Sequence, residues 1–322
     1  ILFYGIEAIR DAGIRRIGIV VGDTADEIRR ACGDGSRWDL EIDYIQQEAP
    51  LGLAHAVLTA EEYLGDEPFV MYLGDNILAR GIVGLVEEFR RDEPSAQILL
   101  AHVPKPEQFG VAELEDGRVV HLEEKPRHPK SDLALVGVYM FSSSIFEAAR
   151  AIEPSGRNEL EITDAIQYLI DKGYTVRPHI VEGWWKDTGK LMDLLEANRL
   201  VLDTLQPCIS GKVDADSRVE GKVIIEEGAE VIASVVRGPT VIGARSRIEN
   251  AYIGPFTSVH EDVLVRASEV EHSIILSGSS ILELRNRVEG SLVGHNVHIE
   301  RTQTKPMAYR FMLGDNSSVE VV

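Results

Sequence analysis

The sequence contains few cysteines, no long apolar run and no leader-like segment. Its 322 residues include two cysteines, Cys32 and Cys208, which are too few for a disulfide framework or a cysteine-rich metal site. No uninterrupted apolar stretch reaches the ~18 residues of a transmembrane helix. The first residues do not resemble a signal peptide. We therefore expect a cytoplasmic protein with no membrane partner.

Basic side chains are also scarce. The chain has 33 lysines and arginines against 53 aspartates and glutamates, a formal net charge of −20 at pH 7. This balance argues against a protein that binds nucleic acid through a basic surface. The hydrophobic content of 44% and charged content of 27% are ordinary for a globular protein. The length allows two domains of about 150 residues each.

Aromatic residues are rare in the last third of the chain. Residues 206–322 contain only Tyr252, Phe256, Tyr309 and Phe311, and they carry 12 basic and 16 acidic side chains. Residues 1–205 carry 21 basic and 37 acidic side chains and all the other aromatic residues. This change in composition predicts two domains of different architecture, 1–205 and 206–322.

Helical and strand-like patterns alternate along residues 1–205. We expect helices at 2–13, 24–32, 53–64, 81–91 and 190–203, and strands at 16–21, 40–45, 69–73 and 96–103. Thr24 and Glu27 have the spacing of a capping box. Asp116-Gly117 lies between two short apolar runs, which indicates a β-hairpin. The alternation predicts a doubly wound, mostly parallel, Rossmann-like α/β domain with an antiparallel insertion.

Aliphatic residues recur about every six positions in the second domain. They are Val213, Val219, Ile225, Val231, Val236, Ile242, Ile248, Ile253, Val259, Val265, Ile275, Ile281, Val293 and Ile299. This hexapeptide period predicts a left-handed parallel β-helix whose coils stack aliphatic ladders into a core. A β-sandwich is the alternative, but it gives no reason for a six-residue period.

Two acidic residues follow apolar or aromatic segments. Asp75 comes after the expected strand at 69–73, at the edge where open α/β sheets bind ligands. Asp187 lies in Trp184-Trp185-Lys186-Asp187, just before an expected helix. Each could simply be a turn or helix-cap residue. Together they could hold Mg²⁺, which accepts one or two carboxylates plus substrate phosphates.

Other polar residues have both a structural and a functional interpretation. Glu124 and Lys125 form a solvated ion pair, or they bind a sugar hydroxyl and a phosphate. Gln47 can pair with the imide edge of a base, and Gly52 lets a base or ribose approach the backbone. Glu159 lies in the acidic first turn of an expected helix, where it also favours the helix dipole. None of these segments alone decides the function.

The order of the segments is more specific. The succession IQQEAPLGLAHAV, MYLGDN, QFGVAEL, EEKP, LALVGVYMF, GRNELEITDAI and WWKDTG resembles the sugar-1-phosphate nucleotidyltransferases. Together with the repeat and the closing MLGDNSSVEV, it is most similar to the long form of the glucose-1-phosphate thymidylyltransferases. The resemblance implies a metal site at Asp75 and Asp187, and catalytic roles for both and for Lys125. It further implies that Gln47 and Gly52 contact the base, that Gly110, Glu124, Val136 and Glu159 line the sugar pocket, that Lys125 binds the sugar phosphate and that Trp185 closes the floor.

The resemblance also implies a reaction. Glucose 1-phosphate attacks the α-phosphorus of dTTP, with Mg²⁺ as cofactor, and gives dTDP-glucose and pyrophosphate. UTP is the alternative nucleotide, and a homo-oligomer is expected. The glycine-rich, triphosphate-binding motif of such proteins would precede residue 1. We therefore expect a longer intact protein, with a chain that lacks this loop inactive or severely impaired.

Two other functions stay open at this point. Hexapeptide solenoids also occur in acyltransferases, so the chain could be bifunctional, with His260, His272, His295 or His298 as a general base. Alternatively, the protein is a regulatory subunit that keeps the fold without the phosphate loop.

Overall fold

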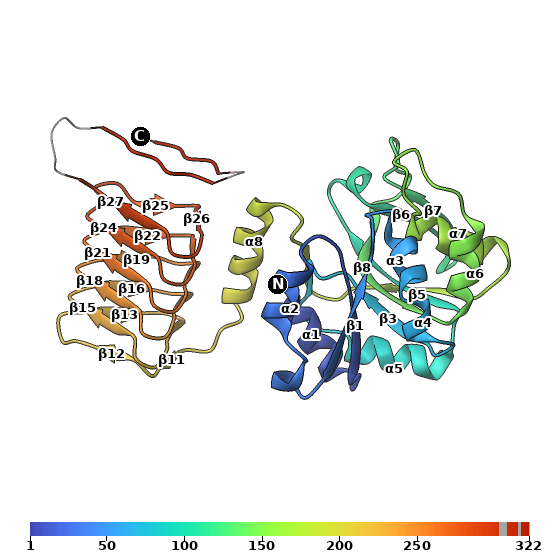
Figure 1. The fold of residues 1–322 in the computed structure, drawn as a ribbon, viewed down its shortest axis with the longest axis horizontal. Coiled ribbons are helices and arrows are strands. Elements are labelled where there is room, and N and C mark those ends of the chain that lie inside the picture. The colour runs from blue at the N-terminus through green and yellow to red at the C-terminus, as the bar shows by residue number, and fades with distance from the viewer. Residues whose placement is uncertain (303–307, 315–316, 322) are drawn as a thin grey trace. The chain divides into compact units, whose positions relative to one another are not determined.

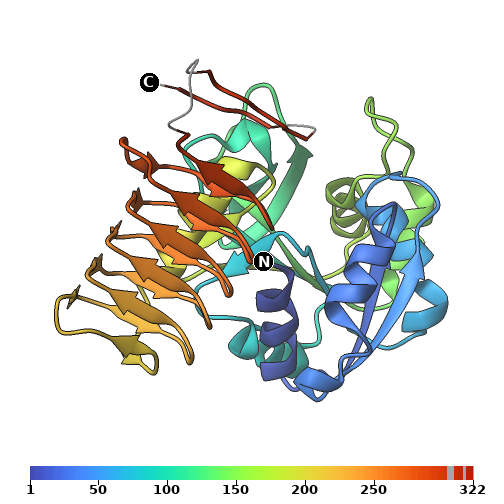
Figure 2. The ribbon, with the colours of Figure 1, turned by 60° about the vertical axis from the view of Figure 1, so that its left-hand side comes forward.

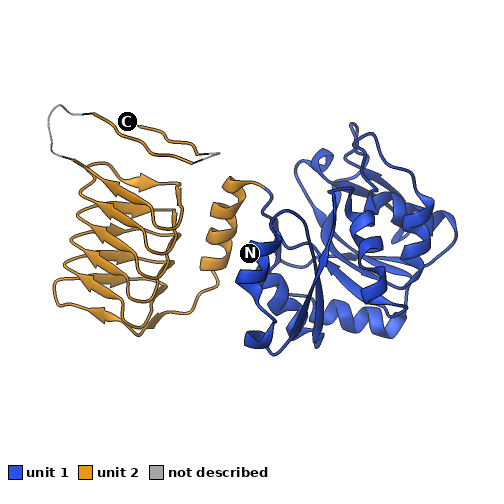
Figure 3. Ribbon diagram, viewed as in Figure 1, with its two compact units in different colours: residues 1–189 blue, residues 190–322 orange. Residues whose placement is uncertain are grey.

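The computed structural model describes residues 1–302, 308–314 and 317–321. It divides the chain into two compact units, Ile1–Gly189 and Lys190–Val322 (Figure 3). The predicted domain boundaries, 1–205 and 206–322, were placed where the amino-acid composition changes, and they stay a prediction. They differ from the units in α8 (Leu191–Leu202), which packs on β20 (Thr257–Val259) of the second unit. None of the described helices is long and apolar enough to cross a membrane.

Unit 1 alternates helices and strands, as the sequence predicts (Figure 1). Its helices are α1 (Leu2–Asp11), α2 (Ala25–Cys32), α3 (Leu53–Thr59), α4 (Glu61–Leu64), α5 (Val83–Asp92), α6 (Ser144–Ala151) and α7 (Ile162–Asp171), with 3-10 turns at Ser36–Trp38 and Pro106–Gln108. Its strands are β1 (Arg16–Val21), β2 (Glu41–Gln46), β3 (Phe69–Tyr72), β4 (Asn76–Leu78), β5 (Ala96–His102), β6 (Gly110–Glu115), β7 (Arg118–Glu124), β8 (Leu133–Phe141), β9 (Val176–Ile180) and β10 (Trp185–Asp187).

The central sheet is mixed in direction. Its order is β7-β6-β8-β5-β9, and β3 also pairs with β8. The α/β class is confirmed, but the expectation of mostly parallel pairing is wrong for this sheet. Strand β8 runs antiparallel to β3, β5 and β6, because the chain returns from the β6–β7 hairpin in the opposite direction. Parallel pairing holds for β5–β9 and β1–β2.

Two apolar cores cover the two faces of β8. All nine residues of β8 are buried. Leu135, Tyr139 and Phe141 pack with residues of α3, α6 and α7, whereas Val136, Val138 and Met140 pack with residues of α5 and α1. Alternate side chains of a strand point to opposite faces, so a strand buried on both sides is apolar throughout.

Two local expectations have different outcomes. In the β6–β7 hairpin, Asp116 and Gly117 have φ angles of 48° and 75°. Positive φ at both central residues is typical of a type I′ turn, so the predicted hairpin is confirmed. Helix α2 begins after Thr24 as predicted, but the Thr24 side chain makes no cap hydrogen bond, so the capping box is wrong.

Unit 2 is a parallel β-solenoid whose coils stack strand on strand (Figures 1 and 2). One sheet contains β11 (Cys208–Ile209), β14 (Val223–Ile225), β17 (Thr240–Ile242), β20, β23 (Ile274–Ile275) and β26 (Leu292–Val293). The second contains β12 (Lys212–Val213), β15 (Glu230–Ile232), β18 (Arg247–Glu249), β21 (Leu264–Arg266), β24 (Ser280–Leu282) and β27 (His298–Glu300). The third contains β13 (Arg218–Glu220), β16 (Val235–Arg237), β19 (Tyr252–Ile253), β22 (Glu269–Glu271) and β25 (Val288–Glu289).

The predicted aliphatic residues form the three ladders of this solenoid. Val231, Ile248 and Val265, for example, are register partners in successive coils and are fully buried. The ladder in the third sheet also includes Val270 and Val288, which the six-residue count missed because the spacing becomes irregular there. The parallel β-helix is therefore confirmed. Its left-handed sense stays a prediction.

Candidate active site

The two acidic residues predicted to hold a metal lie together. Strand β4 pairs antiparallel with β10, so that Asn76 is the register partner of Asp187. The segment after β10 turns back onto Asp75: the Thr188 N–H and hydroxyl donate to the Asp75 carbonyl oxygen at 3.0 and 2.7 Å. The Gly189 N–H donates to Asp187 Oδ1 at 2.9 Å. Pairing of two strands far apart in the sequence thus brings the backbones of the two acidic residues together.

Asn76 lies beneath this pair and was not singled out from the sequence. It is 3% exposed. Its Oδ1 accepts hydrogen bonds from Trp185 Nε1 at 2.6 Å and from the Gly137 N–H at 3.2 Å. Its Nδ2 donates to Asp75 Oδ1 at 2.7 Å. Asn76 therefore joins β8, β10 and Asp75.

Gly110 and Glu124 face each other across the β6–β7 hairpin. Thr163 Oγ1 donates to Glu124 Oε2 at 3.2 Å. A Cβ atom at Gly110 would lie 2.6 Å from Thr163 Cγ2 and 3.1 Å from Glu124 Oε2, so only glycine fits without a shift. The predicted sugar-pocket residues Gly110 and Glu124 are thus in direct contact.

Lys125 and Trp185 are linked through Phe109. The Lys125 N–H donates to the Phe109 carbonyl oxygen at 3.0 Å, and Lys125 has a φ of 45°. Its Nζ lies 3.8 Å from Glu124 Oε1. The Phe109 ring meets the half-buried Trp185 ring edge-on, with centroids 5.5 Å apart. The predicted phosphate-binding residue and the predicted floor of the site therefore contact the same aromatic residue.

Arg157 contacts three carboxylates. Its Nη2 lies 3.1 Å from Glu124 Oε1, 3.5 Å from Glu159 Oε2 and 2.8 Å from Glu161 Oε2. Glu159 was predicted from this segment as a site residue, whereas Arg157 and Glu161 were not. The available signal was the spacing of Arg157 and Glu161, which are four residues apart and of opposite charge.

Burial and the neighbouring Glu161 charge raise the pKa of Glu124. Lys125, Arg157 and the Thr163 hydroxyl oppose this shift by favouring the ionised carboxylate. A carboxylate in such a site accepts hydrogen bonds from hydroxyl groups more strongly than one in water, because it has lost solvent partners.

The predicted base-binding residues lie in the loop between β2 and α3. Gln47 Nε2 is 2.9 Å from His55 Nδ1. Gly52 has a φ of 102°, and a Cβ atom there would lie 2.4 Å from the Leu160 carbonyl oxygen. The Leu160 backbone occupies the space that a side chain at this position would need, so packing by itself requires a glycine here. Contact with a base stays a prediction for both Gln47 and Gly52.

Val136 differs from the other predicted sugar-pocket residues. Its side chain is fully buried in the apolar core that contains Leu78, Ile82 and Leu99. Any contribution of Val136 to a polar ligand therefore comes from its backbone.

The nucleotidyl transferase family matches residues 1–204 of the chain. The chain belongs to this family. The glucose-1-phosphate thymidylyltransferase of Streptomyces antibioticus is 57% identical over 323 residues, covering 100% of this chain and 90% of that protein. A low-salt glycan biosynthesis nucleotidyltransferase of Haloferax volcanii is 44% identical over 326 residues, with coverages of 100% and 91%. A Bacillus anthracis protein solved with sucrose is 32% identical, with a TM-score of 0.58 over 62% of this chain and 81% of its own.

The donor set of this nucleotidyl transferase fits a magnesium ion shared with phosphates. Within the described residues, no group of three or more His, Cys, Asp or Glu side chains could hold a metal by itself. Asp75 and Asp187 supply two carboxylates, which are hard oxygen donors, from two segments whose backbones pair. Mg²⁺ is commonly held by one or two carboxylates plus substrate phosphates and water.

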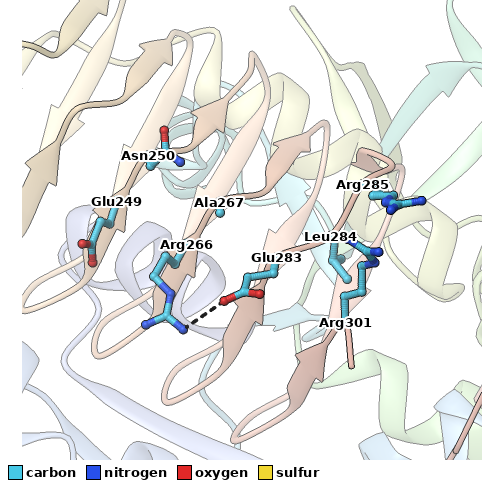
Figure 4. Close-up of a pocket in the computed structure, with 8 residues that line it drawn as sticks. All are labelled: Glu249, Asn250, Arg266, Ala267, Glu283, Leu284, Arg285 and Arg301. Carbon is cyan, nitrogen blue, oxygen red and sulfur yellow. Dashed lines mark ion pairs between the residues drawn. The ribbon is translucent and has the colours of Figure 1, made fainter. Parts of the chain in front are cut away.

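In unit 2 of the nucleotidyl transferase, His260 lies close enough to Glu261 and His295 for their charges to act on it. His272 packs edge-on against Phe256, His298 lies between Ser280 and Glu300, and His260 and His295 are exposed. A shallow pocket on the solenoid contains none of these histidines (Figure 4). It is lined partly by Arg266 and Glu283, which form a 3.7 Å ion pair across neighbouring coils.

Proposed function

We propose that this protein transfers the thymidylyl group of dTTP to glucose 1-phosphate, giving dTDP-glucose and pyrophosphate. The pairing of β4 with β10 carries the proposal, because it sets Asp187 opposite Asn76, the residue after Asp75, in a chain of this family. The 57% identity to a thymidylyltransferase over the whole chain supports the choice of substrates.

Each residue of the site has a task in this reaction. Glu124 accepts a sugar hydroxyl, and Gly110 keeps the pocket open at its side. Lys125 neutralises the sugar phosphate, whose oxygen attacks the α-phosphorus in line with the departing pyrophosphate. A magnesium ion held by Asp75 and Asp187 would neutralise phosphate charge. Most of the rate enhancement then comes from positioning and charge neutralisation, as is general for phosphoryl transfer.

Gln47 supports the choice of a pyrimidine with an imide edge. One of its amide N–H groups is directed at His55, which leaves the amide oxygen and a second N–H for the base. Thymine and uracil share this edge and differ by a methyl group. The selection of dTTP over UTP therefore rests on the relatives and not on Gln47.

The test is pyrophosphate release from an array of nucleoside triphosphates and sugar 1-phosphates. We expect dTTP with glucose 1-phosphate to give the highest kcat/KM. Asp75→Asn and Asp187→Asn should each lower turnover at least about a hundredfold, because each removes a metal ligand. Wild-type rates in both variants would refute the metal assignment. A clear preference for another sugar or nucleotide would refute the substrates.

The acyltransferase alternative has its own test. A general-base histidine on the solenoid would make acetyl transfer from acetyl-CoA sensitive to a single His→Ala change, for example at His298. His272 packs against Phe256, and His298 contacts Ser280 and Glu300, so we assign these side chains to the packing of the solenoid and expect no acetyl transfer above background.

A further inference from the structure

The Asn76 side chain has a forced orientation. An indole N–H and a backbone N–H can only donate hydrogen bonds, so the atom that faces both Trp185 Nε1 and the Gly137 N–H must be the amide oxygen. The amide nitrogen then faces Asp75 Oδ1, a carboxylate oxygen that can only accept. Chemistry alone thus decides between the two flips of this amide.

The surroundings allow no other placement of Asn76. A Cβ atom at Gly137 would lie 2.6 Å from Asn76 Nδ2, so the glycine of β8 provides the space for the amide. Asp75 is held at its backbone oxygen by Thr188 and at Oδ1 by Asn76. In the described part of the chain, Asp75 Oδ2 has no hydrogen bond to a protein atom. It is the oxygen left for a ligand.

We propose that Asn76 is a positioning residue that orients the Asp75 carboxylate for a divalent cation. It also joins this carboxylate to Trp185, the predicted floor of the sugar pocket. The inference rests on the proposed function, since it assigns the cation to Asp75 and Asp187. Groups that hydrogen-bond to metal ligands orient them, and their loss typically weakens metal binding about 10–100-fold.

A second buried amide, in the central sheet, shows what a purely structural role looks like. Gln97 of β5 is 1% exposed, and its Nε2 makes a long 3.5 Å hydrogen bond to the Leu85 carbonyl oxygen. Its Oε1 has no partner. The sheet therefore tolerates a poorly satisfied amide, whereas every polar atom of the Asn76 side chain is bonded to a residue of the site.

The experiment measures Mn²⁺ binding to the whole protein by water-proton relaxation. We expect Asn76→Leu, which keeps the volume, to bind Mn²⁺ about 10–100-fold more weakly than the wild type. Trp185→Phe removes one donor to Asn76 and keeps the ring against Phe109, so we expect a smaller loss of affinity in the same direction. Gln97→Met, a matched loss of a buried amide, should bind Mn²⁺ like the wild type.

Three results would overturn the proposal. The first is wild-type affinity in a folded Asn76→Leu protein, and the second is an equal loss in Gln97→Met. If Asn76→Leu does not fold, unchanged Mn²⁺ affinity in Trp185→Phe is the third. The assay needs no turnover: a wild type that binds Mn²⁺ but makes no dTDP-glucose would refute the proposed function and leave the Asn76 test valid.

Discussion

Glu124 is the residue whose environment has the clearest consequence for pH. Burial and the Glu161 charge raise its pKa, so it becomes protonated at a higher pH than an exposed glutamate. A protonated Glu124 accepts hydroxyl hydrogen bonds poorly. We therefore predict that the KM for glucose 1-phosphate rises on acidification at a pH above the usual glutamate range of about 4.3.

Glu161→Gln provides the control for this pH effect. It removes the like charge that raises the pKa of Glu124 and keeps a polar group beside Arg157 and Ser155. The acid limb of the KM profile should therefore move to lower pH. Titration of the substrate is the same for both proteins, so superimposable profiles would show that Glu124 does not control sugar binding.

His55 leads to a second prediction at the residue scale. The Gln47 amide nitrogen faces His55 Nδ1 at 2.9 Å, which leaves the amide oxygen for the base. This orientation suits the imide of thymine, whereas a flipped amide suits N3 and the amino group of cytosine. In His55→Phe we expect the kcat/KM ratio of dTTP to dCTP to fall about tenfold, which corresponds to about 1.4 kcal/mol.

An acceptor placed near the same position should restore the preference. Asn can present its side-chain oxygen close to where Nδ1 lies, so His55→Asn should recover most of the dTTP preference. An unchanged ratio in His55→Phe would show that Gln47 keeps its orientation without His55, or that it does not read the base.

Single residues also show the limit of prediction from sequence. Asp75 and Asp187 could be predicted as metal ligands because each follows a recognisable segment, and this role stays a prediction. Asn76 and Arg157 were missed, because their roles depend on contacts with β8, β10 and Glu124 that only the folded chain creates. For Gly52 the structure adds a second reason for glycine that the sequence did not reveal, since a Cβ atom there would clash with the Leu160 backbone.

At the element scale, buried serines hold the corners of the solenoid. Ser246 is 1% exposed, donates to the His260 carbonyl oxygen at 2.6 Å and accepts from the Val263 N–H at 3.0 Å. Ser279, two coils further along the solenoid, makes the equivalent bonds to the Gly294 carbonyl oxygen and from the Val297 N–H. Each hydroxyl therefore satisfies backbone groups of the next coil that would otherwise be buried without a partner.

Ser246→Ala should weaken the solenoid locally. Leaving one buried N–H and one carbonyl unsatisfied costs about 1–3 kcal/mol. Hydrogen exchange of the peptides that contain Val263 reports this change directly, as lower protection of their amides. The exposed Ser210 provides the control: Ser210→Ala should change local stability by less than about 0.5 kcal/mol. Unchanged exchange in Ser246→Ala would rule out the corner role.

Strands whose residues repeat with a strict period were predicted well. The direction of a strand within its sheet was not, because it depends on how the chain connects the strands. The ladder residues of the solenoid follow from a count of six, because each coil repeats the same geometry. The direction of β8 could not be predicted from its own residues, since an apolar run reads the same whether the strand is parallel or antiparallel. The break between α3 and α4 was also missed, because the apolar pattern continues across Ala60.

At the scale of the whole molecule, charge opposes the proposed substrates. The chain carries a net charge of −20, and residues 1–205 hold 37 acidic against 21 basic side chains. The basic residues of the site do not offset this negative charge, because they lie among carboxylates: Lys125 and Arg157 contact Glu124, Glu159 and Glu161. Anionic substrates therefore approach a protein whose electrostatic field repels them. A bound cation neutralises only part of this negative charge.

Salt should therefore speed up the capture of glucose 1-phosphate. Raising ionic strength from about 0.01 M to about 0.15 M shortens the Debye length from about 30 Å to about 8 Å and screens long-range repulsion. At saturating Mg²⁺ and dTTP, we expect kcat/KM for glucose 1-phosphate to rise about twofold or more with KCl. Steering by attraction has the opposite salt dependence. A fall in kcat/KM would show that Lys125 and Arg157 dominate the field that the substrate meets, despite the surplus of acidic groups around them.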